Sequence, residues 1–342
     1  MKNGFKKSIK WTALFVCPII AFSLAIIGAS EREESGASYE ETSQNISADI
    51  TPAGRIYNIL VLGNDEVSGL SDVLLIVSCD TNKKQINVLQ IPRDTYAEYT
   101  DAAYRKINGA RNSLGSVKAV ADFLGETLSV SIDRYVTLDL DTVGRVVDVL
   151  GGVEIDVPID MVYEDPYQGL SINIRKGKQI LSGEEAKQFV RYRSGYTRGD
   201  LDRLDAQKLF LSSLVKKLSD QSNIFSVLEI LGTVIKSAET DISYEYCFEI
   251  IKELGIPSME DVTFVTLPGC DIQSSSGAWY YVMNRRASYE LIKERFAPDI
   301  TEDEFDKKRR FTSSAGKGFC DIYEATEGYE TKIYSAREMS GG

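Results

Sequence analysis

The sequence predicts an α/β protein, an α-β-α sandwich with a central, mostly mixed β-sheet, preceded by one transmembrane helix. Short runs rich in Ile and Val, each bounded by turn residues, are interleaved along the chain with segments of helical periodicity. The apolar runs are continuous rather than alternating, which is typical of strands in a sheet covered on both faces. A charge-free stretch near the N-terminus predicts the membrane helix.

This transmembrane helix is predicted over residues 11–30, which carry no charge. At ~1.5 Å per residue such a helix crosses a ~30 Å hydrocarbon layer. Four lysines precede it and Glu31, Glu33 and Glu34 follow it. By the positive-inside rule, residues 1–10 form a cytoplasmic tail, and the chain after the helix lies outside the cell, anchored to the cytoplasmic membrane. A cleaved signal peptide, ending in the small residues at 28–30, is the alternative.

The elements expected after the membrane helix follow one another in a regular order. Residues 31–54 are polar and predict a flexible extracytoplasmic linker. Residues 55–296 predict the folded domain, and residues 297–342 a charged, loosely ordered tail. Ser182 and Glu185 predict a capping box at the start of a helix that ends near Val190. The expected strands are 56–63, 71–80, 85–92, 134–140, 153–158 and 261–267, and the other expected helices are 113–128, 141–150, 200–218, 223–238, 243–254 and 284–296.

Composition excludes several classes of function. The 342 residues include no His, which removes every mechanism that needs an imidazole, from Ser-His-Asp hydrolysis to His-ligated zinc. The formal net charge is −12, which argues against a nucleic-acid-binding protein, because such proteins need a positive surface. Any chemistry therefore uses carboxylates, Lys, Arg, hydroxyls or thiols.

Two aspartates flank the loop between the first two predicted strands, at the ends of those strands. Asp65 comes directly after the first strand, and Asp72 opens the second strand. In open α/β sheets, ligands gather beyond the carboxyl ends of strands, and paired carboxylates with phosphate oxygens suit Mg²⁺. The alternative is that both are ordinary turn residues.

Arginines provide the second candidate feature. Arg93 follows a strand that Pro92 ends, although an ordinary surface Arg-Asp pair with Asp94 is an equal alternative. Four more arginines fall within thirteen positions of this acidic chain, at 191, 193, 198 and 203. Arg191 and Arg193 share a face only where the chain is extended, so the helix before them must end near Val190. This local reversal of charge predicts an anionic ligand.

In the helix predicted at 200–218, the face that carries the leucines begins with polar residues. Asp200, Arg203 and Gln207 share a face with Leu204, Leu211, Leu214 and Leu218. Buried polar groups carry a desolvation cost, so these three are expected to line a pocket. The alternative is that Asp200 is an N-cap paired with Arg203, and both roles are compatible with an anion site.

Together these motifs resemble the LytR-CpsA-Psr (LCP) family, which attaches secondary polymers to the bacterial cell wall. The resemblance runs from Ile56 to Phe296 and rests on the order and spacing of several motifs. They are VLGND at 61–65, SD at 71–72, IPRDTY at 91–96, KINGA at 106–110, VDVLGGVEIDVP at 147–158, LSGEEAKQFVRYR at 181–193 and GDLDRLDAQ at 199–207.

The resemblance implies a membrane-anchored phosphotransferase outside the cell. Its donor would be an anionic glycopolymer of the teichoic-acid or capsule type, linked to undecaprenyl pyrophosphate, with the lipid in an apolar tunnel. The acceptor would be the 6-hydroxyl of N-acetylmuramic acid in peptidoglycan. By similarity, Asp65 and Asp72 bind Mg²⁺, and Asp200 is the candidate general base. The resemblance also implies a set of pyrophosphate-binding residues, which are Arg93, Arg191, Arg193, Arg203 and Gln207. Arg203 is in addition implied to be a catalytic residue, together with Asp200.

The chain departs from the family pattern at two positions. Leu70 and Ala206 stand where family members commonly carry arginine, so two phosphate contacts are missing. Two other functions therefore remain open at this stage. One is a pyrophosphatase that hydrolyses the lipid-linked donor, and the other is a non-catalytic, lipid-binding or regulatory protein of the envelope.

Overall fold

The computed structural model describes residues 54–64, 69–99, 106–166, 170–197, 200–219, 232, 234–254, 258–274, 277–307 and 333–339. The predicted transmembrane helix at 11–30 and nearly all of the predicted linker at 31–54 lie outside these residues. Among the helices that are described, none is both long enough and apolar enough to cross a membrane.

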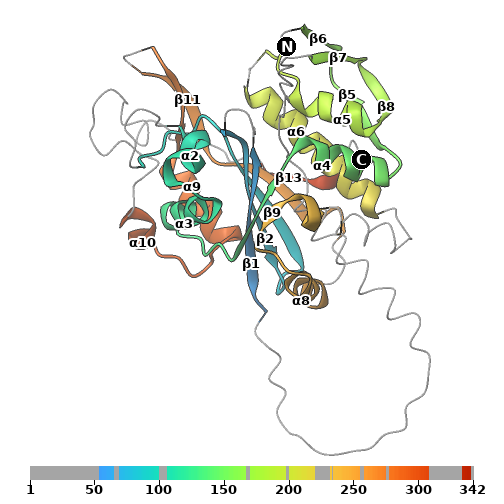
Figure 1. Cartoon of the computed structure of the whole chain (residues 1–342). Helices are drawn as coiled ribbons and strands as arrows, with labels where there is room; N and C mark the ends of the chain where they lie inside the picture. Colours follow the sequence, from blue (N-terminus) through green and yellow to red (C-terminus); the bar gives the residue numbers. More distant parts are fainter. Residues whose placement is uncertain are drawn as a thin grey trace, which may run out of the picture.

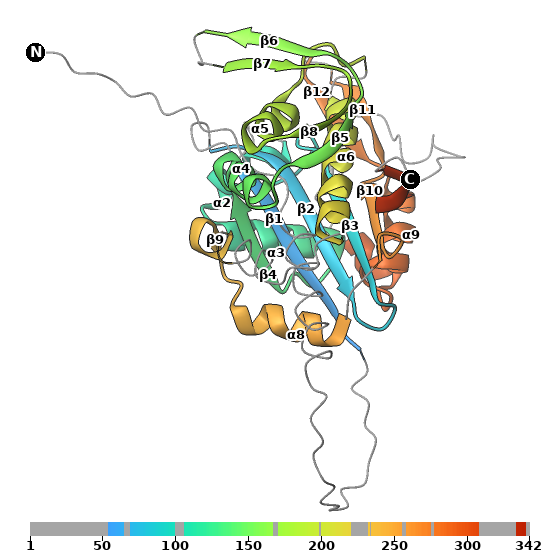
Figure 2. The same ribbon diagram turned by 90° about the vertical axis from the view of Figure 1, so that its right-hand side faces the viewer.

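A seven-stranded mixed sheet forms the centre of the molecule (Figures 1 and 2), with the strand order β13-β10-β3-β2-β1-β4-β9. Two neighbouring pairs, β1 with β4 and β3 with β10, are parallel, and the other pairs are antiparallel. The central mixed sheet predicted from the sequence is therefore confirmed. The strands are β1 (Ile56–Asn64), β2 (Ser71–Asp80), β3 (Gln85–Ile91), β4 (Arg134–Leu138), β9 (Glu239–Thr240), β10 (Val262–Thr266) and β13 (Ile333–Ser335).

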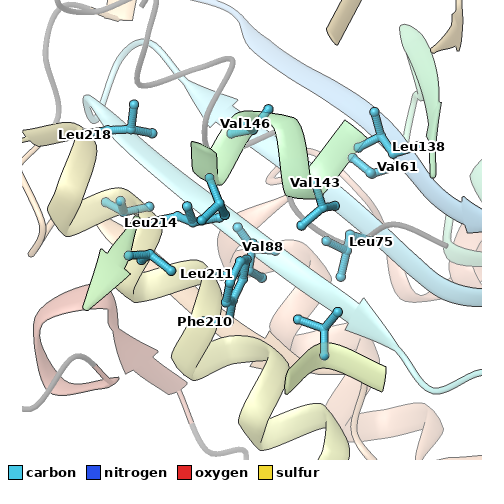
Figure 3. Packing of buried hydrophobic residues seen from close by; sticks show 14 of the residues in the cluster. Val61, Leu75, Val88, Leu138, Val143, Val146, Phe210, Leu211, Leu214 and Leu218 are labelled. Atoms are coloured by element: carbon cyan, nitrogen blue, oxygen red, sulfur yellow. The ribbon is translucent and has the colours of Figure 1, made fainter. Parts of the chain in front are cut away.

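Helices cover both faces of this sheet, as the continuous apolar strands predict. Val61, Leu75 and Val88 point into one core, against α4 (Leu140–Val149), α5 (Gly183–Arg191), α6 (Asp200–Ser219) and α8 (Tyr244–Leu254). Figure 3 shows this core between the strands, α4 and α6. Leu62 and Ile76 point into the opposite core. That core also contains residues of α2 (Ala110–Leu114), α3 (Val117–Leu128), α9 (Arg285–Arg295) and α10 (Glu302–Lys307), preceded by the 3-10 helix η1 (Ile107–Gly109).

Helix boundaries follow from local chemistry. The Ser182 hydroxyl accepts the Glu185 N–H while the Glu185 carboxylate accepts the Ser182 N–H, so the predicted capping box begins α5. The predicted helix at 113–128 is divided in two, because Gly115 takes a left-handed φ of 83° and ends α2. Ser116 then caps α3 by accepting the Ala119 N–H.

The described residues also form three two-stranded ribbons outside the central sheet. Only β5 was expected, within the strand predicted at 153–158. The ribbons pair β5 (Val153–Val157) with β8 (Gly177–Leu181), β6 (Met161–Asp165) with β7 (Leu170–Ile174), and β11 (Gly269–Gln273) with β12 (Trp279–Met283).

The predicted loosely ordered tail is wrong for part of residues 297–342. Here α10 packs on the core, β13 pairs antiparallel with β10 at the edge of the sheet, and α12 (Ala336–Met339) places a fully buried Ala336 in the core that contains α6. The sequence carries no signal for this order because β13 has only three residues. A strand that short is held by backbone pairing and does not need a long apolar pattern. The helix predicted at 223–238 lies largely outside the described residues.

Candidate active site

Sheet topology brings Asp72 and Arg93 together. Strands β2 and β3 are antiparallel, with Leu74 opposite Ile91, so the start of β2 lies beside the end of β3. Arg93 Nη1 donates to Asp72 Oδ1 at 2.8 Å. Arg193 Nη2 donates to the other carboxylate oxygen, Oδ2, at 3.0 Å. A single carboxylate therefore joins two of the predicted phosphate-binding arginines, of which Arg193 lies 121 positions after Asp72 in the sequence.

The charge of Asp72 is set by two opposing effects. Its side chain is 12% exposed, and this burial alone would raise the pKa. The positive charges of Arg193, Arg93 and Arg203 together outweigh burial and lower the Asp72 pKa below its ordinary value. Asp72 is therefore ionised at neutral pH. Three guanidinium groups around one carboxylate leave a net positive charge, which suits an anionic ligand.

Arg203 and Gln207 lie on the inward face of α6, as the helical spacing predicts. They are only 2% and 3% exposed, and they share this face with the buried Leu204, Leu211, Leu214 and Leu218. Gln207 Oε1 accepts a hydrogen bond of 3.0 Å from Gln90 Nε2 on β3. Sequence analysis missed Gln90, although a polar residue between Leu89 and Ile91 of a buried strand was a usable signal.

The end of α5 positions Arg193. The helix ends at Arg191, and Tyr192 has an extended conformation with φ −59° and ψ 133°. The prediction that this helix ends near Val190 is confirmed. The Tyr192 ring then meets Tyr196 edge to face at 5.4 Å. Burial raises the pKa of Tyr196, so its hydroxyl stays protonated. Arg191 is half-buried at the end of the helix, and its role at the site stays a prediction.

A lysine that sequence analysis missed offsets the negative charge of Asp94 beside Arg93. Lys106 opens the KINGA motif, and its Nζ lies 3.1 Å from Asp94 Oδ1. Arg93 Nε lies 3.9 Å from the same Asp94 oxygen. The predicted Arg93–Asp94 pair is therefore present. The shorter ion pair of Arg93, however, is with Asp72.

Several predicted site residues fall outside the described part of the structure. Asp65, Arg198 and the side chain of Asp200 are among them, and Asp200 is placed only as the first residue of α6. Among the described side chains, no three His, Cys, Asp or Glu residues cluster as metal ligands. The paired aspartates and their metal remain a prediction.

The two departures from the family pattern occupy different surroundings. Leu70 lies two residues before Asp72 and is half-buried. Ala206 is 5% exposed and belongs to the core between α6 and the sheet. At position 206 this chain therefore uses a small side chain for packing, one residue before the polar Gln207.

A mixed sheet between two helical layers, with a cluster of arginines around one ionised aspartate at the strand ends, defines an α/β protein whose fold and charge suit an anionic ligand. The comparisons with known proteins agree with this class: residues 22–296 match the LytR_cpsA_psr family, and the chain belongs to that family.

Individual relatives are 25% to 29% identical to the chain over the aligned residues. The polyisoprenyl-teichoic acid–peptidoglycan teichoic acid transferase TagV of Bacillus subtilis strain 168 is 29% identical over 250 residues, covering 70% of this chain but only 63% of TagV. The crystal structure of B. subtilis TagV aligns with a TM-score of 0.58 at 26% identity, covering 70% of this chain and 96% of that one. A structure of TagT bound to LIIa-WTA aligns with a TM-score of 0.57 at 25% identity, covering 70% and 89%.

Proposed function

We propose that this protein transfers an anionic glycopolymer from undecaprenyl pyrophosphate to the 6-hydroxyl of N-acetylmuramic acid in peptidoglycan. The observation that carries the proposal is the convergence of Arg93, Arg193 and Arg203 on the ionised Asp72. The names of the relatives support it, because TagV is a transferase that joins teichoic acid to peptidoglycan. The position of the polar cluster at the strand ends is also where α/β folds bind ligands.

The proposed reaction is a single displacement at phosphorus. The acceptor oxygen bonds to the phosphorus that carries the polymer, and the bond from that phosphorus to the bridging oxygen breaks. Undecaprenyl phosphate leaves with the electron pair. The acceptor proton passes to a base, for which Asp200, one helical turn before Arg203, is proposed.

The arginines supply what such a transfer needs most. Phosphoryl transfer asks a protein mainly for positioning and for cations around the spreading negative charge. Arg93 and Arg193 are held by Asp72 before any ligand arrives, so their guanidinium groups are already oriented. Arg203 projects from a buried helical face and therefore loses little freedom on binding.

Asp72 also fits a magnesium ligand in chemistry. It is an ionised, hard oxygen donor, and each of its oxygens accepts one arginine bond while a carboxylate offers about four acceptor sites. We propose that Asp72 and Asp65 hold Mg²⁺, which would neutralise charge on the diphosphate oxygens. We further propose that the chain is anchored to the cytoplasmic membrane by residues 11–30, with its catalytic domain outside.

The test uses the full-length protein in detergent. It is incubated with Mg²⁺, a lipid-pyrophosphate-linked anionic polymer and peptidoglycan, and the products are separated by size. Transfer yields polymer bound to peptidoglycan together with lipid monophosphate. Free polymer phosphate would instead identify a pyrophosphatase. No turnover with several donors, combined with intact donor binding, would identify a non-catalytic lipid-binding protein.

A further inference from the structure

The β11–β12 ribbon carries the most exposed aromatic side chain among those that the described residues contain. Trp279 is 56% exposed, whereas Tyr281, two residues further along the strand, is only 3% exposed. A single exposed aromatic ring is common on protein surfaces, so the side chains around Trp279 decide whether it belongs to a binding surface.

Polar side chains lie beside Trp279 on the same face of the ribbon. Trp279 pairs with Gln273, and Tyr281 pairs with Asp271, so these side chains share one face. Asp271 and Gln273 are both exposed. Gln273 Nε2 donates to the carbonyl of Gly277, which fixes the amide beside the turn. The face therefore combines an aromatic ring with a carboxylate and an amide.

That combination matches the chemistry of a sugar. A pyranose ring has a face of C–H groups, which stacks on an aromatic ring, and a rim of hydroxyls that need donors and acceptors. Carboxylates accept, and amides both accept and donate. Binding sites of this kind pair apolar ring surface with a few well-placed polar groups.

The ribbon is attached directly to the candidate active site. Tyr281 N–H donates to the Asp94 carbonyl, and Tyr96 N–H donates to the Tyr281 carbonyl. Tyr280 on the other face meets Tyr96 edge to face at 5.7 Å. Trp279 is two strand residues, about 7 Å, from this attachment, which begins one residue after Arg93. Figures 1 and 2 both show the ribbon rising at one end of the sheet.

Charge separates the two possible saccharide ligands. Residues 269–283 contain Asp271 but no Lys or Arg. Lys106 Nζ lies 5.6 Å from the ring centre of Tyr280, on the other face of the ribbon. On the Trp279 face the ribbon itself presents the Asp271 carboxylate and no cation, which disfavours an anionic polymer more than a neutral amino-sugar chain. We propose that the Trp279 face of β11–β12 binds the glycan strand of peptidoglycan next to the reacting sugar. This assignment of an acceptor subsite rests on the proposed transferase function.

A binding experiment tests the subsite without requiring turnover. The chain has two tryptophans, so full-length Trp11→Phe protein in detergent leaves Trp279 as the only indole fluorophore. Titration with an N-acetylglucosamine tetrasaccharide is expected to shift its emission and to protect it from acrylamide quenching. Poly(glycerol phosphate) is expected to do neither. An unchanged spectrum with the tetrasaccharide, or an equal response to the anionic polymer, overturns the proposal.

A kinetic experiment then separates the subsite from the chemistry. Trp279→Ala is expected to raise KM for the peptidoglycan acceptor about tenfold, with kcat and donor KM unchanged, because one stacked aromatic contact is lost. Trp279→Tyr restores most of the affinity. Phe248→Ala, which removes an aromatic side chain 48% exposed on α8, is the matched control and leaves KM unchanged.

The outcomes distinguish the subsite from the transfer reaction itself. Tetrasaccharide binding without any turnover supports the subsite and counts against the proposed transfer. Turnover with an unchanged acceptor KM in Trp279→Ala overturns the subsite alone. A fluorescence shift with phosphatidylglycerol vesicles but not with the saccharide would identify a membrane contact and also overturn it.

Discussion

The inward face of α6 is polar in its first half, at Arg203 and Gln207, and apolar in its second half, at Leu211 and Leu214. All four side chains are at most 3% exposed, so burial does not distinguish the halves. What differs is the surroundings. Arg203 and Gln207 face Asp72 and Gln90 at the strand ends, whereas Leu211 and Leu214 pack among strand side chains and Val146 of α4 (Figure 3).

One helical stripe therefore serves two purposes. Buried apolar groups stabilise the fold, while buried polar groups carry a desolvation cost that only a partner or ligand offsets. The first half is therefore expected to govern binding and activity, and the second half to govern stability. Leu214→Ala and Arg203→Met test that division, whereas Gln207→Leu and the pH dependence of Asp72 test how the buried polar groups are stabilised by their partners.

The largest expected effect belongs to the apolar half. Leu214→Ala is expected to reduce the free energy of unfolding by about 2–5 kcal/mol, because it leaves a cavity in a close-packed core. Activity per folded molecule should not change. Denaturant unfolding and transfer assays at low temperature measure the two quantities, and a large loss of specific activity would contradict the division.

The polar half should respond in the opposite way. Arg203→Met is expected to reduce transfer roughly 100-fold or more, by analogy with the loss of a donor that stabilises transition-state charge. Its unfolding free energy should change little, because removing one of three arginines around a single carboxylate relieves positive repulsion. Lys217→Met, near the other end of α6, is the control that keeps both properties. Equal losses of stability and activity in Arg203→Met would argue for a structural role.

The hydrogen-bonded pair of Gln90 and Gln207 tests whether both buried amides can be replaced together by apolar side chains. Gln207→Leu leaves the buried Gln90 amide without its acceptor and is expected to cost about 1–3 kcal/mol of stability. The double variant Gln90→Leu/Gln207→Leu should recover most of that loss. A double-mutant cycle from chemical denaturation measures the coupling, and strictly additive losses would show that the hydrogen bond contributes nothing.

The smallest effect concerns pH. The Asp72 pKa is lowered in the folded protein, so its contribution to stability is present above the ordinary value of 3.8 and is lost as pH falls through the lower, folded value. The difference in Tm between wild type and Asp72→Asn should therefore stay constant at mildly acidic pH and shrink only in strong acid. Shrinkage that begins above the ordinary carboxylate value would mean that burial outweighs the arginines.

Sequence reasoning predicted the parts of this molecule that local chemistry determines. The Ser182–Glu185 capping box, the end of α5 near Val190 and the inward face of α6 all depend on residues a few positions apart. Residue patterns also singled out Asp72, Arg93 and Arg193, to which the family resemblance assigned roles, and the structure supplies the distances between them. Asp65 and Asp200 remain predictions.

The missed features are those that depend on distant partners. Gln90 meets Gln207 across 117 positions, and no local pattern encodes that pairing. The β6–β7 and β11–β12 ribbons were missed because strands of five residues outside the main sheet carry weak alternation. Lys106 was visible only as part of a motif, and its contact with Asp94 depends on the turn after β3.

The pairing of β13 with β10 has a consequence for how this protein is handled. A shortened chain that stops at Phe296, where the family match ends, would lack Ile333–Ser335 and leave one side of β10 without its hydrogen-bonded neighbour. An uncovered strand border is a template on which other chains add by backbone pairing. We therefore expect Ile333–Ser335 to shield β10 from pairing with other chains, so that recombinant versions that retain these residues stay in solution at concentrations where trimmed versions precipitate.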